Sequence, residues 1–487
     1  MRTVVVIGGG FSGTLAALHL VRAGTHVVLV EPNSSPGRGV AYSPPTHDFL
    51  LNVPAGRMSA WSDRAGDFLQ WLQHSDPFAD AATFAPRAAY GDYLAHLLAG
   101  ERANPRLDVV RDRAIDLKRH RTGFTVTLAA GGQLRCGGVV LALGNAPPRP
   151  LPASHAAGRH DKVLDHPLAD LRSLAPDTDA TVGIAGTGLT ALDIIMWLEQ
   201  RGHRGRIVAV SRRGLTPIPH TLTAPAALPQ LPDALLRRPT VRRLLRWLRE
   251  TGLHLAAAGV APCRAVDALR PVTAQLWQDM TPEERRRFCR HVRPYWDVNR
   301  HRSPPALNRL LVNGIAAGRI EVRAARILGW EPHPDRGVRL TLQPREDPAR
   351  VDVEDVDWLV NCTGPERDVT RQTDPLVGAL LDKGLVTPDP LGLGIRTGAR
   401  GEVLDRDGTV VPGAFAIGPW RVAGLWESSA VPELRGQAAT VAAALAESAA
   451  QDMADLRGQP GPDRIIAPCT VHPVRPVVRM RTVVPGP

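Results

Sequence analysis

The chain begins with a short β-branched run and then a glycine-rich turn, and this pattern restricts its fold more than any other feature. Residues 3–7 form the run, and residues 8–13 follow with the spacing G-x-G-x-x-G. A helix is predicted at about 12–23, and a second apolar run at 27–30 ends at Glu31. This is the order of a dinucleotide-binding βαβ unit. Its predicted binding residues are Gly8, Gly10, Phe11, Ser12, Gly13 and Glu31.

Each part of this unit has a physical role. The first glycine permits the tight turn, the second lets the backbone approach a pyrophosphate, and the third lets the helix pack against the strand. The helix N-terminus offers N–H groups and a positive partial charge to the phosphates. We expect Glu31 to accept hydrogen bonds from the adenosine ribose. A glycine-rich turn without a ligand is the alternative.

A second unit of the same kind begins at residue 181. Its turn reads G-x-G-x-x-A, between a strand at 182–185 and a helix that extends to about Gln200. The following strand, 207–210, leads to two arginines where the first unit has its acid. A guanidinium binds a 2′-phosphate that a carboxylate repels, so NADPH is predicted rather than NADH. Two solvated arginines are the alternative. The predicted binding residues are Gly186, Thr187, Gly188, Thr190, Ala191, Arg212 and Arg213.

Two such units in one chain suggest a flavin paired with a nicotinamide. Apolar strands that end at Gly144, Gly364 and Gly418 resemble the crossover and late strands of flavoproteins with two dinucleotide sites, and these glycines are predicted to bind cofactor. The predicted fold is α/β, with two three-layer Rossmann-like domains and the NADPH domain inserted in the FAD domain. The predicted segments are an FAD domain at 1–150 and 351–450, an NAD(P)H domain at 151–350 with a mostly helical insertion at about 226–318, and a Pro/Arg-rich tail at 451–487.

Composition excludes several other classes. The five cysteines are odd in number and form no CxxC pair, which argues against a disulfide framework, a zinc site and a dithiol reductase. The net charge of +11 represents either solvated surface arginines or a positive field that gathers anionic dinucleotides and substrate. No nucleic-acid motif and no membrane-length apolar stretch is visible, so neither partner is expected and a cytoplasmic location is predicted. The oligomeric state is not predicted, and no metal is expected.

Further motifs lie between the two glycine turns and after the second one. They are GRGVAY (37–42), LLNVPAGRMS (50–59), FAPR (84–87), SRRG (211–214), WDVNRHR (296–302) and NCTGP (361–365). With these motifs, the chain resembles, over residues 1 to about 446, the FAD/NAD(P)-binding family related to the class B, N-hydroxylating flavin monooxygenases. No F-x-G-x-x-x-H-x-x-x-W pattern of a Baeyer–Villiger enzyme precedes Gly186, and Pro419 stands where many relatives carry an acid that contacts the ribityl chain.

The resemblance implies FAD, NADPH, O2 and a small, anionic, nitrogenous substrate, such as aspartate or a urate-type ring. NADPH would reduce the flavin, and a C4a-hydroperoxyflavin would then hydroxylate the substrate. An NAD(P)H-dependent reductase that passes electrons without inserting oxygen is the first alternative, and a non-catalytic redox sensor is the second.

Four residues are predicted to be catalytic. Asn52, Arg57 and Ser59 lie on the segment expected to cover the flavin, where ordinary loop packing is the alternative. His301 belongs to a basic cluster that either binds an acidic substrate or the NADPH phosphates, or is a solvated face. The other members of that cluster are Arg293, Arg300 and Arg302.

Overall fold

The computed structural model describes residues 3–44, 46–153, 160–221 and 228–457. The first domain is built on a six-stranded sheet in the order β15-β16-β7-β1-β2-β3. Strand β16 pairs in parallel with β7, so distant parts of the chain share one sheet and the rest lies between them as an insertion. The strands are β1 (Val4–Ile7), β2 (Val27–Val30), β3 (Leu107–Val110), β7 (Gly138–Leu141), β15 (Glu402–Leu404) and β16 (Val410–Ala416).

Alternate residues of β1 face opposite layers of this domain. Val4 and Val6 pack with one helical layer, and Val5 and Ile7 pack with a three-stranded antiparallel sheet and α12. The helices of the first layer include α1 (Phe11–Arg22), α2 (Asp67–Leu72), α3 (Arg87–Gly100) and α13 (Val431–Arg457). The opposite layer contains β4 (Ala114–His120), β5 (Gly123–Leu128), β6 (Gln133–Cys136) and α12 (Pro375–Asp382). The predicted three-layer arrangement is therefore confirmed.

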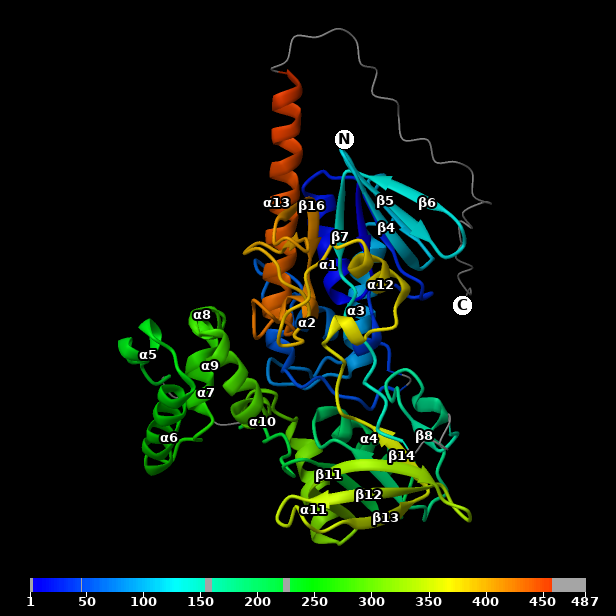
Figure 1. The fold of residues 1–487 in the computed structure, drawn as a ribbon, viewed down its shortest axis with the longest axis vertical. Helices are drawn as coiled ribbons and strands as arrows, with labels where there is room; N and C mark the ends of the chain where they lie inside the picture. The colour runs from blue at the N-terminus through cyan, green and yellow to red at the C-terminus, as the bar shows by residue number, and fades with distance from the viewer. Residues whose placement is uncertain (1–2, 45, 154–159, 222–227, 458–487) are drawn as a thin grey trace.

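The second domain has a seven-stranded sheet in the order β13-β12-β11-β10-β9-β14-β8 and lies below the first in Figure 1. One face is covered by α4 (Leu189–Gln200) and α11 (Pro305–Ala316), whose apolar side chains pack on Val182 and Ile184. The strands are β8 (Val163–Leu164), β9 (Val182–Ala185), β10 (Ile207–Ser211), β11 (Ile320–Pro332), β12 (Val338–Pro344), β13 (Asp352–Val356) and β14 (Trp358–Asn361).

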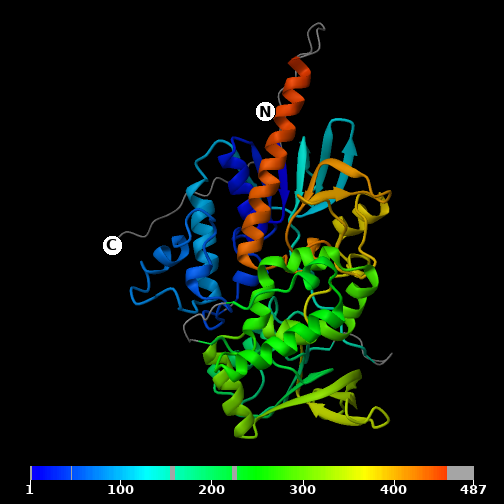
Figure 2. The ribbon, with the colours of Figure 1, turned by 90° about the vertical axis from the view of Figure 1, so that its left-hand side faces the viewer.

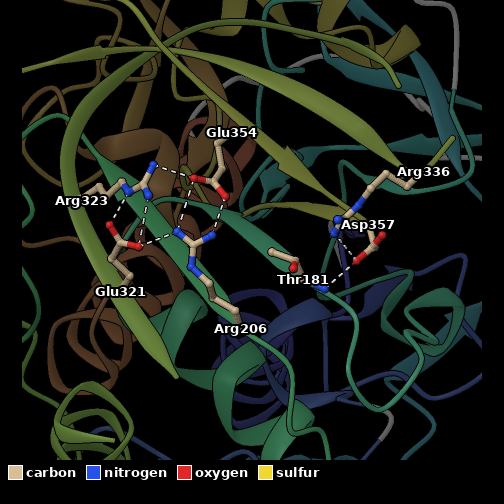
Figure 3. Close-up of polar contacts among 7 residues, drawn as sticks. All are labelled: Thr181, Arg206, Glu321, Arg323, Arg336, Glu354 and Asp357. Carbon is tan, nitrogen blue, oxygen red and sulfur yellow. Dashed lines mark hydrogen bonds and ion pairs between the residues drawn. The ribbon is translucent and has the colours of Figure 1, made fainter. Parts of the chain in front are cut away.

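A network of ion pairs joins three segments of this second sheet (Figure 3). Arg206, which precedes β10, contacts Glu321 on β11 and Glu354 on β13, each at 2.7 Å. Arg323 reaches the other oxygen of Glu354, also at 2.7 Å. Beside it, Asp357 accepts a hydrogen bond from the Thr181 backbone N–H at 2.6 Å. These contacts fix β13 against the parallel strands that carry the second glycine turn.

The predicted helical insertion is present and lies across the junction of the two domains in Figure 2. Trp277 of the insertion and Trp426 of the first domain lie in one apolar cluster, with ring centroids 4.8 Å apart. The helices are α5 (Asp233–Arg237), α6 (Val241–Ala257), α7 (Arg264–Leu269), α8 (Thr273–Asp279), α9 (Pro282–Arg287) and α10 (Arg293–Arg300), with a π-helical turn at Phe288–Val292. The insertion therefore belongs to the second domain in sequence but packs against the first.

One element is longer than its sequence indicates. Helix α13 extends to Arg457, beyond the predicted end of the FAD domain at residue 450, and projects from the body of the molecule in Figures 1 and 2. Its alanine-rich sequence has high helix propensity, which favours this continuation. The predicted tail at 451–487 thus begins within a helix, and residues 458–487 lie outside the described residues. Within the described ranges, no helix has both the length and the apolar character needed to cross a bilayer.

Candidate functional site

The first glycine turn is tightly enclosed by the backbone. Gly8 has a φ of 99°, and a Cβ at this position would lie 2.4 Å from the carbonyl oxygen of Ala142. A Cβ at Gly13 would lie 1.8 Å from the oxygen of Gly8. A side chain at either position would collide with backbone atoms. These atoms cannot move without displacing the neighbouring strands. The structure therefore gives both glycines the roles that their spacing predicts.

The start of α1 presents free donors. Among the described residues, the backbone N–H groups of residues 10–13 have no hydrogen-bond acceptor, whereas the Thr14 N–H bonds to Gly10 at 2.9 Å. Phe11 contributes only its backbone here, because its ring packs against Tyr42 at 6.2 Å. Gly418 also reaches this turn, since a Cβ on it would lie 3.1 Å from the hydroxyl of Ser12. This donor set suits an anionic pyrophosphate.

Glu31 is buried at the edge of the same turn. Its Oε2 accepts a hydrogen bond from the Gly9 N–H at 2.7 Å, and its Oε1 accepts one from the Asn33 N–H at 2.9 Å. These bonds orient the carboxylate beside the turn, at the end of β2, where the ribose acceptor was predicted. The backbone N–H groups of the turn and the side chain of Glu31 thus fit the adenosine half of FAD.

The second turn reproduces the first in detail. Gly8 N–H bonds to Val30 at 2.9 Å, and Gly186 N–H bonds to Val210 at 2.7 Å. Gly186 has a φ of 109°, and a Cβ on it would lie 2.3 Å from the carbonyl oxygen of Cys362. Each turn is therefore closed by the carbonyl that follows a neighbouring parallel strand, β7 in one domain and β14 in the other.

Space remains open above the second turn. A Cβ added to Gly188 would meet no atom within 4 Å, and the same holds for Gly144 and Gly364. The N–H groups of residues 189–191 have no acceptor among the described residues. A dinucleotide pyrophosphate needs this combination of free donors and room for close approach. The second turn thus also fits a dinucleotide, with Thr190 and Ala191 on the first turn of α4.

Three of the predicted coenzyme side chains differ in their surroundings. Thr187 is buried, and its hydroxyl donates to the oxygen of Ser211 at 2.9 Å, so it closes the loop internally. Arg212 is exposed, with no hydrogen bond or ion pair to a described residue. Arg213 donates to the Arg290 carbonyl at 3.2 Å and so contacts the helical insertion. Only Arg212 has its guanidinium fully available to a phosphate.

The three residues predicted on the flavin cover do not share one environment. Ser59 has no exposed surface, and its hydroxyl donates to the Arg64 carbonyl at 2.6 Å. Its side chain therefore stabilises a turn in the core, and its catalytic role stays a prediction. Arg57 is exposed, and Asn52 is half-buried. His220, which sequence reasoning missed, donates from Nε2 to the Asn52 carbonyl at 2.9 Å.

The basic cluster is also divided. Arg302 is 7% exposed and pairs with Asp267 at 2.9 Å, so it stabilises the insertion. Arg300 lies 3.0 Å from Glu427, and Arg293 lies 3.4 Å from Asp297. The three arginines of the cluster thus have acidic partners.

The remaining member, His301, lies beside a cation that the motifs did not identify. Burial lowers the pKa of His301 to about 4, which makes the imidazole neutral near pH 7. Arg367 follows the Gly364 crossover, and its guanidinium has no hydrogen bond or ion pair with a described residue, although its backbone carbonyl accepts one from the Gly394 N–H at 3.0 Å. Burial and the nearby Arg293 charge lower its pKa to about 10, so it stays charged at neutral pH. A desolvated guanidinium without a partner is a candidate anion site.

The helical insertion brings these groups to the first domain. The indole N–H of Trp277 donates to the Ala423 carbonyl at 2.8 Å, and that of Trp296 donates to Glu427 at 2.8 Å. Both acceptors lie shortly after Gly418, which contacts the first glycine turn. The insertion is thus attached at the end of the first sheet where the cofactor turn lies.

Comparison with known proteins agrees with this geometry. Residues 5–146 match a family model described as FAD-NAD(P)-binding. An ornithine N-hydroxylase structure from Kutzneria sp. 744 is 16% identical, with a TM-score of 0.62 over 92% of this chain and 99% of that chain. The chain has the fold of the ornithine hydroxylases. The resemblance inferred from the motifs is therefore confirmed at the level of the fold.

Two further solved structures share this fold. The ornithine hydroxylase of Pseudomonas aeruginosa is 15% identical, with a TM-score of 0.62 over 92% of this chain and 99% of that chain. The L-lysine 6-monooxygenase of Pseudomonas syringae is 17% identical, with a TM-score of 0.63 over 92% of this chain and 100% of that chain. No curated protein matches the sequence significantly.

Proposed function

We propose that this chain is an FAD-dependent, NADPH-consuming monooxygenase that hydroxylates a small, anionic, nitrogenous substrate. The observation that carries the proposal is the presence of two equivalent glycine turns with free N–H donors in one chain. In the balanced reaction, NADPH supplies two electrons, one atom of O2 enters the substrate, and the other leaves as water. The comparison with ornithine and lysine hydroxylases supports this reaction type through their shared fold.

The residues of this chain have separate tasks in that reaction. The first turn of α1 and Glu31 would hold FAD, which supplies the redox and oxygen-activating chemistry when bound. The first turn of α4 would hold the pyrophosphate of NADPH, and Arg212 would bind its 2′-phosphate. Asn52 and Arg57 remain candidates for contacts near the flavin. Gly144, Gly364 and Gly418 would border the cofactors.

Arg367 supports an anionic substrate. Its guanidinium forms no ion pair with a described residue. Asp297 and Glu427 lie near enough to raise its pKa, but they are paired with the neighbouring Arg293 and Arg300. An anion brought to Arg367 would neutralise a charge that burial otherwise leaves unpaired. The neutral imidazole of His301 adds no further positive charge, and it can donate one hydrogen bond to the substrate or accept one from it. An acidic amino acid or a urate-type ring fits this requirement.

A turnover assay tests the proposal. Purified protein is mixed with NADPH, and O2 uptake, free H2O2 and NADPH loss are recorded with aspartate, urate, ornithine and lysine. We expect an anionic compound to stimulate O2 uptake without an equal yield of H2O2, and its hydroxylated product to appear. NADPH oxidation that needs an artificial electron acceptor and ignores O2 would instead identify an electron-transfer reductase. A protein that takes up no FAD would remove both functions.

A further inference from the structure

The segment expected to cover the flavin, residues 50–59, is called the flavin cover below and is attached to the coenzyme domain. Phe49 precedes this segment and belongs to the first domain in sequence, yet it is 1% exposed and lies in the apolar cluster formed by α4 and β9. Three residues later, the Asn52 carbonyl accepts the hydrogen bond from His220. The cover is therefore in contact with the second domain at both of these residues.

A buried ion pair adds a third attachment. Arg87, the first residue of α3, places its Nη2 2.8 Å from Oδ2 of Asp193 on α4, and the two side chains are 14% and 1% exposed. The same guanidinium donates from Nε to the Leu50 carbonyl at 3.0 Å. The Arg87 backbone N–H donates to the Phe49 carbonyl at 2.7 Å. One arginine thus joins α3, the start of the cover and the helix that would carry NADPH.

The electrostatics of this pair indicate a role other than stability. Burial raises the pKa of Asp193 to about 6, even though Arg87 acts to lower it. Two further ionisable groups face the pair: the buried Cys362 thiol at the end of β14 and the Tyr42 phenol. Because the folded-state pKa exceeds the ordinary value of 3.8, the folded protein takes up a proton more readily than the unfolded chain. The ionised pair therefore costs stability at neutral pH.

The contribution of Asp193 to the stability of the fold depends on pH. Stability from a raised carboxyl pKa is present below about pH 4 and is lost as the pH rises through about 6. A carboxylate whose ion pair stabilised the fold would show the opposite trend. In some proteins a buried ion pair that does not stabilise the fold restricts it to one arrangement, because separating the partners leaves an unpaired buried charge.

We propose that Arg87 and Asp193 are positioning residues that hold α4 at a fixed distance from the flavin cover. The pair thereby aligns the nicotinamide with the flavin for hydride transfer. This proposal rests on the proposed function for its effect on rate, but its structural part is independent of any redox activity. Misplacement of reacting groups by about 1 Å lowers rates by roughly a hundredfold, so a remote pair can control the transfer.

The experiment uses the full-length protein and three variants. Asp193→Asn removes the charge, and the double variant Arg87→Met with Asp193→Leu replaces the pair with apolar side chains that restore packing. Glu199→Gln is the matched control, because Glu199 lies on the same helix and pairs with Arg319 inside the second domain. Anaerobic reduction of bound FAD by saturating NADPH is followed in a stopped-flow instrument, with dithionite reduction as a reference. Hydrogen exchange of the peptide spanning 49–57 is measured in parallel.

We expect the apolar double variant to fold and bind FAD, but to be reduced by NADPH about tenfold to a hundredfold more slowly. Dithionite reduction and the Kd for NADPH should stay within about threefold of the wild-type values. The wild-type rate should fall as the pH is lowered through about 6, because Asp193 gains a proton, and the double variant should lack this inflection. Exchange in 49–57 should rise in both Asp193 variants and stay unchanged in Glu199→Gln.

A double variant with normal exchange in 49–57 and a wild-type reduction rate would overturn the positioning role. If the wild-type protein binds FAD but is not reduced by NADPH, the proposed function fails and the exchange data still decide whether the pair holds the cover. If Asp193→Asn does not fold, the apolar pair supplies the same comparison.

Discussion

At the scale of single residues, the glycines of one turn differ in what surrounds them. Gly186 adopts a φ that side chains rarely accept, and a Cβ there would collide with the Cys362 carbonyl. Gly188, two residues later, has open space above it. The first glycine therefore serves the fold, while the second leaves room for a ligand. This difference allows the two roles to be separated by substitution.

Alanine variants of these two glycines should have different defects. Gly188→Ala should fold with an unchanged melting temperature but raise the KM for NADPH by about tenfold or more, because its Cβ occupies the approach of the pyrophosphate. Gly186→Ala should lower the free energy of unfolding by at least about 2 kcal/mol. Urea titrations and steady-state kinetics distinguish the two. A Gly188→Ala protein with normal KM would show that no dinucleotide lies over this turn.

Arg367 provides a second prediction at this scale. Arg367→Ala should raise the KM for an anionic substrate by about tenfold to a hundredfold, since hydrogen bonds to charged groups contribute about 1.5–3 kcal/mol. Arg371→Ala is the control, because Arg371 is exposed and pairs with Asp368 at 3.2 Å. Its KM should stay within about twofold of wild type. Equal effects in both variants would contradict a direct contact between Arg367 and substrate.

At the scale of elements, the buried parallel strands were predictable and strand β13 of the antiparallel extension was not. Strands β1, β2, β9 and β14 are continuous apolar runs, which is typical of strands covered on both faces. Strand β13 reads DVEDV and carries three acids, so it has no such signal. Its Glu354 meets Arg206 from a distant segment, and sequence alone does not show that these segments meet. Its Asp355 pairs with Arg339 on the neighbouring strand β12.

The same limit explains the site residues. The glycine turns were predicted because their function requires a fixed local spacing. The burial of Ser59 was not predicted, because it depends on the packing of α2 and α3 around it. Arg367 was missed because its lack of a partner appears only after folding brings Arg293 and Glu427 to other contacts.

Strand β13 also gives a stability prediction. Glu354→Gln should lower the free energy of unfolding by about 1–3 kcal/mol, because it removes the charge between two arginines at a nearly buried position. Asp355→Asn on the adjacent residue is the control, since the Asp355 side chain is 33% exposed, against 9% for Glu354, and its pair with Arg339 is screened by solvent. Chemical denaturation of both variants measures the difference. Equal stability losses would show that the ion-pair network in Figure 3 stabilises the fold no more than the Asp355–Arg339 pair does.

At the scale of the whole molecule, the helical insertion is the brace between the domains. Its cluster combines Trp277, Phe288 and Trp296 with Trp426 of the first domain. Ring centroids of Phe288 and Trp426 are 5.1 Å apart, in an edge-to-face arrangement. Such buried aromatic contacts dominate the energetics of an interface. The insertion should therefore separate from the first domain only when this cluster is lost.

Trp426→Ala tests the brace. It should lower the stability of the protein by about 3–5 kcal/mol and make residues 228–302 accessible to limited proteolysis. Trp330→Ala is the control, because Trp330 is equally buried but lies in the core of the second sheet. That variant should lose similar stability without selective cleavage of the insertion. Cleavage at the same sites in both would contradict a specific brace.

The attachment of the insertion to residues 423–427 has a consequence for any exchange of modules between related enzymes. A graft limited to 151–350 would separate Trp277 and Trp296 from their hydrogen-bond acceptors, the Ala423 carbonyl and the Glu427 carboxylate. The transplanted segment would then expose aromatic surface and favour aggregation. A stable chimera has to include the 418–427 loop together with the coenzyme domain. Two separate stretches of sequence therefore have to be exchanged together.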